Sequence, residues 1–149
     1  MKLNTRYHNE VEIKEEEILH FEKGIPGFPE EVKFVILPLN EDGSFSVMQS
    51  VETAELAFVI TSPFAFFHDY DFKLEDSIVE ELELKSENDV TVYSILTVED
   101  PFEKTTANLQ APVIINKTNN KAKQVILIDE KYKTKHNLFG KTELHKVKG

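Results

Sequence analysis

Histidines next to carboxylates are the residues of this chain whose types and spacing could support acid–base catalysis. His68 is followed at once by Asp69, and an acid beside an imidazole can orient it to activate a serine. No serine, however, lies in the Gly-x-Ser-x-Gly turn that exposes a nucleophile at the end of a strand. A hydrolase or small-ligand-binding barrel using His68 and nearby carboxylates would need a deep pocket lined by His20 or His68, and it stays an alternative.

Metal and phosphate sites have less support. The run 68–71, His-Asp-Tyr-Asp, gathers possible ligands but lacks the regular oxygen spacing and tight-turn glycine of a calcium loop. Cysteine is absent, which excludes thiolate ligands and disulfides. Gly24 and Gly27 lack the other residues of a dinucleotide-binding or P-loop motif. We therefore expect no catalytic residue, no cofactor and no metal.

Aromatic residues near acidic ones indicate protein binding instead. Five aromatic residues fall within nine positions from Phe64 to Phe72, too many for one face of a strand to bury. Exposed aromatic side chains with a polar rim are typical of interface anchors. We predict that a partner contacts five aromatic anchors and five rim acids: Phe28, Phe66, Phe67, Tyr70 and Phe102, with Glu30, Glu31, Asp69, Asp71 and Glu75. For each aromatic side chain, the alternative is packing in the core.

Charge is divided unevenly along the 149 residues. The net charge is −10, but residues 1–116 carry 24 acidic and 8 basic side chains, whereas residues 117–149 carry 3 acidic and 9 basic ones. An acidic body attracts basic surfaces and repels nucleic acid and anionic membranes. The lysines near the end are not interleaved with aromatic residues that stack on bases. We expect no direct nucleic-acid binding and no membrane binding.

The composition is typical of a cytoplasmic protein. No apolar run approaches the roughly 20 residues of a membrane helix, and residues 1–9 are too polar for a signal peptide. The lack of cysteine suits a reducing compartment. The length favours a single domain, expected at residues 1–140, followed by a basic and disordered tail at 141–149.

Short apolar runs separated by turn residues predict a β-rich fold. The first fourteen residues alternate as two half-buried strands around His8-Asn9. One amphipathic helix is predicted where Leu74, Ile78 and Leu82 lie opposite acidic residues. Further strands are expected at residues 18–21, 34–37, 45–50, 56–61, 90–98, 113–115 and 125–128.

The stretch 105–116, TTANLQAPVIIN, is the centre of the predicted sheet. Pro112 biases Ala111 toward an extended conformation and starts a buried strand at residues 113–115. That strand needs partners on both sides, which we place at 90–98 and at 124–128, the latter after a loop at 116–123. About nine strands with one helix exclude a repeated strand-helix-strand plan, because each parallel pair would need a crossover helix. We predict a small, mostly antiparallel, mainly-β domain, barrel-like or a sandwich, with one short acidic helix.

Several long motifs occur in an order that resembles the FliW family of flagellar assembly factors. They span about residues 3 to 139 and are FEKGIPGFPE (21–30), FVILPL (34–39), Gln49-Ser50, LAFVITSPFAFFHDY (56–70), DVTVYSILTV (89–98) and TTANLQAPVIIN (105–116). The resemblance implies a β-barrel-like binding protein without enzymatic activity and with two partners. One is flagellin, and the other is CsrA, a basic, dimeric RNA-binding regulator that represses flagellin synthesis.

The resemblance also implies a cycle of partner exchange. A FliW protein released from flagellin, as flagellin is exported, binds CsrA and relieves the repression. We expect the chain to be monomeric when free. A chaperone with many clients is a further alternative, and it would not form a stoichiometric complex with a single client.

Overall fold

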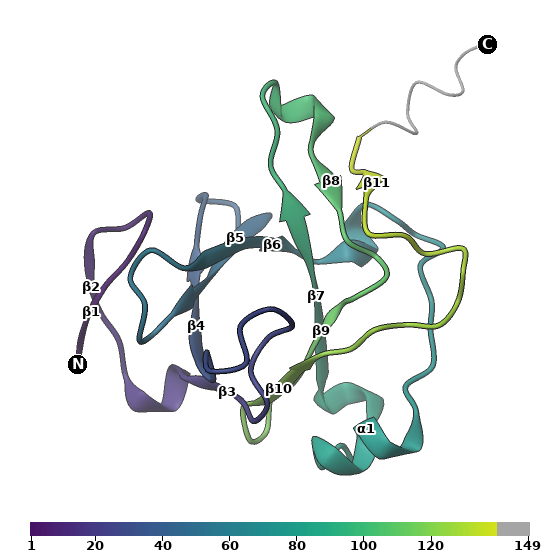
Figure 1. The fold of residues 1–149 in the computed structure, drawn as a ribbon, viewed down its shortest axis with the longest axis horizontal. Coiled ribbons are helices and arrows are strands. Elements are labelled where there is room, and N and C mark those ends of the chain that lie inside the picture. Colours follow the sequence, from purple (N-terminus) through teal and green to yellow (C-terminus); the bar gives the residue numbers. More distant parts are fainter. Residues whose placement is uncertain (140–149) are drawn as a thin grey trace.

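The computed structural model describes residues 1–139, which form a closed β-barrel with one short helix (Figure 1). Strand β7 pairs with β6 on one side and with β9 on the other, so the barrel closes. All barrel pairs are antiparallel except β3–β10. This confirms the predicted mainly-β, mostly antiparallel architecture. The barrel strands are β3 (Leu19–Phe21), β4 (Lys33–Pro38), β5 (Phe45–Ser50), β6 (Ala57–Thr61), β7 (Val90–Thr97), β9 (Val113–Asn116) and β10 (Lys121–Gln124).

The remaining elements of residues 1–139 surround the barrel. Strands β1 (Lys2–Asn4) and β2 (Glu10–Glu12) form a separate hairpin. Strands β8 (Thr106–Ala107) and β11 (His136–Asn137) extend the sheet from the end of β7. The helix is α1 (Asp76–Glu81), and single 3-10 turns are η1 (Glu15–Glu17), η2 (Pro63–Ala65), η3 (Glu87–Asp89) and η4 (Phe102–Lys104).

Apolar side chains fill the interior of the barrel. Phe21, Phe34, Met48, Ile60 and Val113 are each at most 1% exposed and belong to one cluster. The rings of Phe21 and Phe34 meet edge to face, with centroids 5.3 Å apart. Close packing of this kind fills the space that a small-ligand-binding barrel would keep open.

Strand β9 is covered on both faces, which explains its unbroken apolar sequence. Val113 and Ile115 point into the barrel, whereas Ile114 packs outside it beneath Ile78 and Leu82 of the helical segment. A strand buried on both sides loses the alternation of apolar and polar residues. The apolar face of the helix is thus the face that packs on β9.

Residues 24–29, called the plug loop below, fold back into one mouth of the barrel (Figure 1). Ile25 is 3% exposed and joins the interior cluster. The loop is held by backbone hydrogen bonds in both directions between Ile25 and Phe28, at 3.1 and 2.6 Å. Gly24 adopts φ +73°, a left-handed conformation that glycine reaches without strain.

The strand predicted at residues 125–128 is wrong, because the partner of β9 is β10 at Lys121–Gln124. The turn between them is tighter than expected, since Asn120 adopts φ 63° and its N–H bonds to the Asn116 carbonyl oxygen at 2.8 Å. The regular ladder ends at Val113 because Pro112 has no N–H to donate.

Other predicted elements differ only in extent. The helix is shorter than the apolar spacing indicated. The N-terminal strands surround a turn that includes His8 and Asn9, as predicted. The expected boundary at residue 140 and the expected tail at 141–149 lie outside the described residues.

Candidate partner-binding surfaces

The ten predicted contact residues lie on different parts of the barrel surface. Phe66 and Phe102 come close together through two further phenylalanines, whereas the plug-loop residues lie elsewhere. The parts are the plug-loop region with Phe28, Glu30 and Glu31, the segment after β6 with Phe66, Phe67, Asp69, Tyr70, Asp71 and Glu75, and the β7–β8 connection with Phe102.

Four phenylalanines, called the phenylalanine quartet below, form a ring of contacts: Phe45, Phe66, Phe102 and Phe139. The centroid of Phe45 lies 5.8 Å from that of Phe66 and 5.6 Å from that of Phe102. Phe139 closes the ring at 5.9 Å from Phe66 and 5.6 Å from Phe102. Phe102 is 42% exposed although two aromatic rings, Phe45 and Phe139, contact it. A supported but exposed aromatic ring can bind a partner at little entropic cost.

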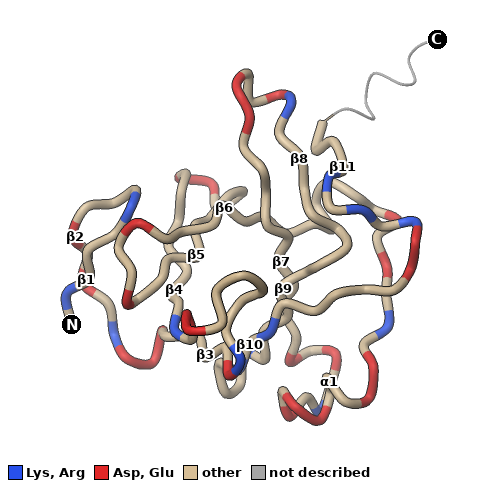
Figure 2. The backbone as a smooth tube through the Cα atoms, in the orientation of Figure 1, with Lys and Arg blue, Asp and Glu red and all other residues tan. Residues whose placement is uncertain are grey.

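The hairpin of β7 and β8 carries Phe102 and stands away from the barrel (Figure 1). Its tip holds the exposed acids Glu99, Asp100 and Glu103, shown in red in Figure 2. Val98 beside them is 49% exposed. The N–H of Glu99 donates to the Thr105 hydroxyl oxygen at 3.1 Å, which ties the two ends of the connection together. The quartet therefore has an apolar centre and an acidic rim, the pattern of a surface for a basic partner.

Tyr70 belongs to the core. It is 5% exposed, and its hydroxyl donates to the carbonyl oxygen of Leu109 at 2.7 Å. Its ring packs edge to face against Tyr132, with centroids 4.8 Å apart. Burial, with a smaller contribution from Tyr132, raises the pKa of the Tyr70 phenol, so the hydroxyl stays a hydrogen-bond donor. The structure therefore gives Tyr70 the alternative role, packing.

The other predicted residues after β6 are spread along a loop. Phe67 is half-buried, with its centroid 6.1 Å from that of His136. Asp69, Asp71 and Glu75 are exposed, and Glu75 precedes the first residue of α1. The three acids are thus available to a partner.

A shallow hollow of about 280 Å³ brings His68 together with His136. Asp69, Tyr70 and Tyr132 also line it, but no serine does, and His20 lies on β3 instead. The N–H of Lys133 donates to Nε2 of His136 at 2.8 Å, so that nitrogen is already engaged. Burial lowers the pKa of His136. Neither the filled barrel nor this hollow is the deep histidine-lined pocket that the hydrolase alternative requires.

Glu30 and Glu31 are neighbours in very different surroundings. Glu30 is exposed, whereas Glu31 is half-buried and accepts hydrogen bonds from the hydroxyls of Ser50 and Thr53 at 2.5 and 2.6 Å. The same Ser50 oxygen accepts the N–H of Glu52 at 3.1 Å. Glu31 thus closes the β5–β6 turn, while Glu30 is available to a partner.

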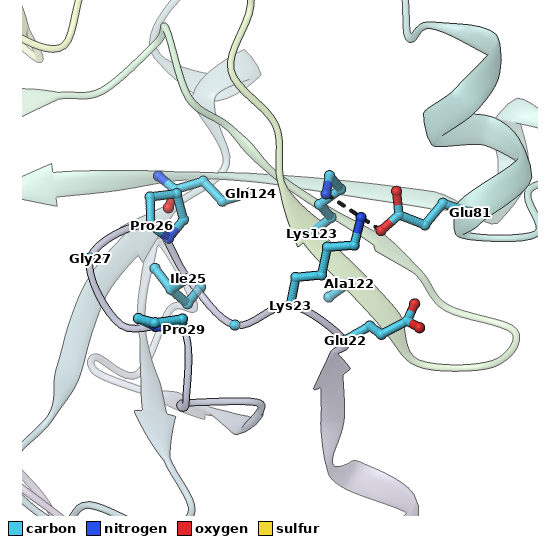
Figure 3. A pocket seen from close by; sticks show the side chains of 11 residues that line it. Glu22, Lys23, Ile25, Pro26, Gly27, Pro29, Glu81, Ala122, Lys123 and Gln124 are labelled. Atoms are coloured by element: carbon cyan, nitrogen blue, oxygen red, sulfur yellow. Dashed lines mark hydrogen bonds and ion pairs between the residues drawn. The ribbon is translucent and has the colours of Figure 1, made fainter.

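The plug loop lines a second hollow of about 280 Å³ beside β10 (Figure 3). Ile25 and Pro26 of the plug loop line it together with Lys123 and Gln124 of β10. Lys123 is paired with Glu81 at 3.4 Å, which joins β10 to α1. Outside the hollow, Phe28 is 42% exposed and leans on Phe58 with centroids 6.1 Å apart. Phe28 is the exposed aromatic residue of this mouth.

A wider groove of about 790 Å³ runs between α1 and β7. Half-buried Leu74, Val79 and Val92 are among its apolar lining, and Asp71 lies at its rim. Within residues 1–139, no three histidine or acidic side chains gather closely enough to hold a metal ion. In the same residues, no helix has the length and apolar character needed to cross a bilayer.

Sequence reasoning missed several exposed or supporting residues. Phe45 and Phe139 complete the quartet, but each stands singly in the sequence, without a cluster to mark it. Ile126 and Ile128 are 63% and 88% exposed although they lie in an apolar run. Only the direction of the backbone there, which the sequence does not reveal, exposes them.

Comparison with known proteins agrees with the motifs. The sequence profile of the FliW protein family matches residues 2–138. The flagellar assembly factor FliW of Bacillus pumilus SAFR-032 is 55% identical over 136 residues, which cover 91% of this chain and 94% of that protein. The flagellar assembly factor FliW of Bacillus subtilis 168 is 52% identical over 142 residues, with 95% and 99% covered.

A solved structure shows the same fold. The crystal structure of a flagellar assembly factor FliW superposes with a TM-score of 0.89 at 50% identity, covering 93% of this chain and 97% of that one. Profile, sequence identity and fold all agree over nearly the whole length. The chain belongs to the FliW family of flagellar assembly factors.

Proposed function

We propose that this flagellar assembly factor binds flagellin and, once released from it, binds and antagonises the translational regulator CsrA. This exchange relieves the repression of flagellin synthesis. Membership of the FliW family supports the proposal. The protein acts by stoichiometric binding without covalent chemistry. It works in the cytoplasm, where messenger RNA is translated and where flagellin resides before export.

The observation that carries the CsrA half of the proposal is the phenylalanine quartet with its acidic rim. CsrA is a basic protein, and Glu99, Asp100 and Glu103 are exposed on the same connection that carries the exposed Phe102. Opposite charges at the rim speed the encounter, whereas an aromatic ring at the centre supplies most of the binding energy.

Charge also supplies a mechanism for the antagonism. Residues 1–116 carry 24 acidic and 8 basic side chains. Such a body beside an RNA-binding surface repels approaching phosphates within about 8 Å, the Debye length at physiological salt. The protein therefore reduces RNA binding without having to occupy the RNA site, and an induced shift in CsrA would add to this effect.

Binding of purified CsrA, measured by calorimetry, tests the role of the quartet. Phe102→Ala is expected to weaken CsrA binding about tenfold or more, because it removes the exposed anchor. Phe64→Ala is the matched control, since Phe64 is 44% exposed and Phe102 is 42% exposed. Equal affinities for the two variants would remove the quartet from the interface. Size-exclusion runs in which neither flagellin nor CsrA associates with the protein would overturn the whole proposal.

A separate measurement tests the electrostatic mechanism of CsrA antagonism. The affinity of CsrA for RNA is measured over a range of salt concentrations with the protein saturating. We expect the loss of RNA affinity to shrink as salt rises, because screening weakens the repulsion between exposed charges. A loss that stays constant with ionic strength would refute the electrostatic mechanism and leave the induced shift.

A further inference from the structure

Residues 125–128, called the isoleucine edge below, continue the ladder between β9 and β10 on one side only. The N–H of Val125 donates to the carbonyl oxygen of Pro112 at 2.9 Å, and the N–H of Leu127 donates to that of Gln110 at 2.8 Å. These two bonds keep the antiparallel register of β9 and β10, in which Gln124 faces Val113. The segment is therefore extended, although proline breaks the regular ladder.

The opposite side of this segment is open. Successive amides of an extended chain point in opposite directions, so those of Ile126 and Ile128 face away from Gln110 and Pro112. Neither amide has a hydrogen-bond partner among residues 1–139. Strand β3 covers β10 only at Lys121 and Ala122, where the parallel pairing ends.

Side chains alternate along the segment in the same way. Val125 and Leu127 pack into the apolar cluster that also holds Phe45, Phe66 and Phe139. Ile126 and Ile128 point into solvent, 63% and 88% exposed, and Ile128 is the most exposed of the large apolar residues of 1–139. Packing on one side thus keeps the segment extended. Its other side presents isoleucine side chains and amides that have no partner within residues 1–139.

An open edge of this kind is unusual in a protein that stays in solution. Natural sheets protect their edges with a proline, a bulge or an inward-pointing charge, because free backbone groups pair with other chains. The isoleucine edge has none of these in its four residues, Val-Ile-Leu-Ile. A second extended chain is the one cover that satisfies a row of alternating backbone donors and acceptors.

We propose that the isoleucine edge binds an extended segment of flagellin by adding it as a further strand to the sheet. The proposal rests on the flagellin binding proposed above and assigns that partner a surface. The bound segment is apolar at every second position, where it contacts Ile126 and Ile128. Its backbone pairs with the amides of the same two residues.

Charge separates this surface from the quartet. The lysines that flank the edge are already paired, Lys123 with Glu81 at 3.4 Å and Lys131 with Asp129 at 3.9 Å. An edge whose four residues carry no charge fits an uncharged segment, whereas the acidic quartet fits a basic partner. A second copy of the chain fits less well, because each copy carries a net charge of −10 and the copies repel each other.

Amide hydrogen exchange of the full chain, resolved by NMR, tests the proposal directly. In the free protein, the amides of Ile126 and Ile128 should exchange fast, and those of Val125 and Leu127 should be protected. Saturating monomeric flagellin should slow exchange at Ile126 and Ile128 by about tenfold or more, as new backbone hydrogen bonds do. Binding of flagellin without any protection there would overturn the assignment.

Flagellin binding by two variants of the edge tests the proposal independently of hydrogen exchange. Ile126→Pro removes an outward-facing donor and blocks the edge, and the double variant Ile126→Thr with Ile128→Thr keeps strand propensity but removes apolar surface. Each should weaken flagellin binding about tenfold or more. The control is Leu39→Thr. Leu39 is an apolar residue that is 42% exposed and directly follows the last residue of β4.

The possible outcomes are distinct. If the wild-type chain binds no flagellin, the proposed function fails and this inference fails with it. If flagellin binds but both edge variants match the control, the inference alone is wrong. A concentration-dependent dimer that protects Ile126 without flagellin would assign the edge to a second copy and overturn the proposal. If Ile126→Pro does not fold, the exchange experiment on the wild-type chain still decides.

Discussion

The side-chain amide of Asn116 donates a hydrogen bond to the carbonyl oxygen of Leu82 at 2.8 Å, which fastens the end of the helical segment to strand β9. Asn116 is 0% exposed, and its amide oxygen accepts bonds from the N–H and the hydroxyl of Thr118 at 2.9 and 2.7 Å. One buried side chain therefore shapes the β9–β10 turn and also holds the helix over Ile114.

Replacing Asn116 should destabilise the whole fold. Asn116→Ala leaves the Leu82 carbonyl oxygen and the Thr118 N–H without these partners, so we expect the free energy of unfolding to fall by about 2 to 3 kcal/mol. Urea denaturation followed by circular dichroism measures the change. The control is Asn88→Ala in an exposed turn, and equal losses for both variants would contradict the role of Asn116.

Two glycines of the plug loop should respond differently to alanine. A Cβ on Gly24 would lie 2.5 Å from the carbonyl oxygen of Pro29, whereas a Cβ on Gly27 would meet nothing within 4 Å. Both glycines have positive φ, +73° and +88°, so both variants pay the left-handed strain of about 1 kcal/mol. Gly24→Ala should lose clearly more stability than Gly27→Ala in thermal denaturation, because the backbone at Phe28 and Pro29 must also move to make room for the new Cβ. Similar melting temperatures would show that the loop gives way easily.

The adjacent residues Glu30 and Glu31 should differ in their contribution to stability. Glu31→Ala removes the acceptor of two hydroxyl hydrogen bonds, so we expect the free energy of unfolding to fall by about 1 to 2 kcal/mol. Glu30→Ala changes an exposed side chain and should stay within about 0.5 kcal/mol of wild type. Denaturant titration of both variants checks the contrast, and a reversed order would refute the assignment of Glu31 to the β5–β6 turn.

Stability should fall with acidification because of His136. Burial, with a smaller contribution from Lys133, lowers its pKa below the ordinary value of 6.5. Below about pH 6.5 the unfolded chain binds a proton that the folded chain does not, so the free energy of unfolding declines until the pH reaches the folded pKa. The same protonation would break the bond that Nε2 accepts from the Lys133 N–H.

The measurement compares denaturation at about pH 7.5 and about pH 5.5, on either side of the ordinary histidine pKa. His136→Gln keeps an acceptor but cannot gain a proton, so it should lose less stability than wild type over this interval. His20→Gln, which removes an exposed imidazole, is the control. Identical slopes for wild type and His136→Gln would assign the acid sensitivity to other groups.

Patterns within single segments were sufficient for most of the strands and for the family. Residues 34–37 and 45–50 form the hairpin of β4 and β5 because apolar runs and a turn sequence act locally. The spacing of Ile78 and Leu82 correctly placed the helix, since that face packs on Ile114. These features depend on residues close together in the chain, so they can be predicted from the sequence alone.

The distribution of aromatic residues between core and surface needed the tertiary structure. Tyr70 is buried and Phe102 is 42% exposed, yet both lie outside the strands and next to acidic residues. Phe45 and Phe139 both contact Phe102 only because β5 and the end of the described chain converge on the β7–β8 hairpin. Contacts between residues so distant in sequence leave no local pattern.

By itself, the sequence determined an acidic, β-rich chain of the FliW family, because charge, periodicity and motif order are local properties. Only the tertiary structure decided that β7 and β9 close the barrel and that Ile126 and Ile128 face outward, with amides that lack a partner in the described part of the chain, residues 1–139. An apolar run predicts burial, but the packing of Val125 and Leu127 on one side turns the alternate residues to solvent. The direction of a side chain is fixed by what its neighbours pack against, and that choice is made across the whole fold.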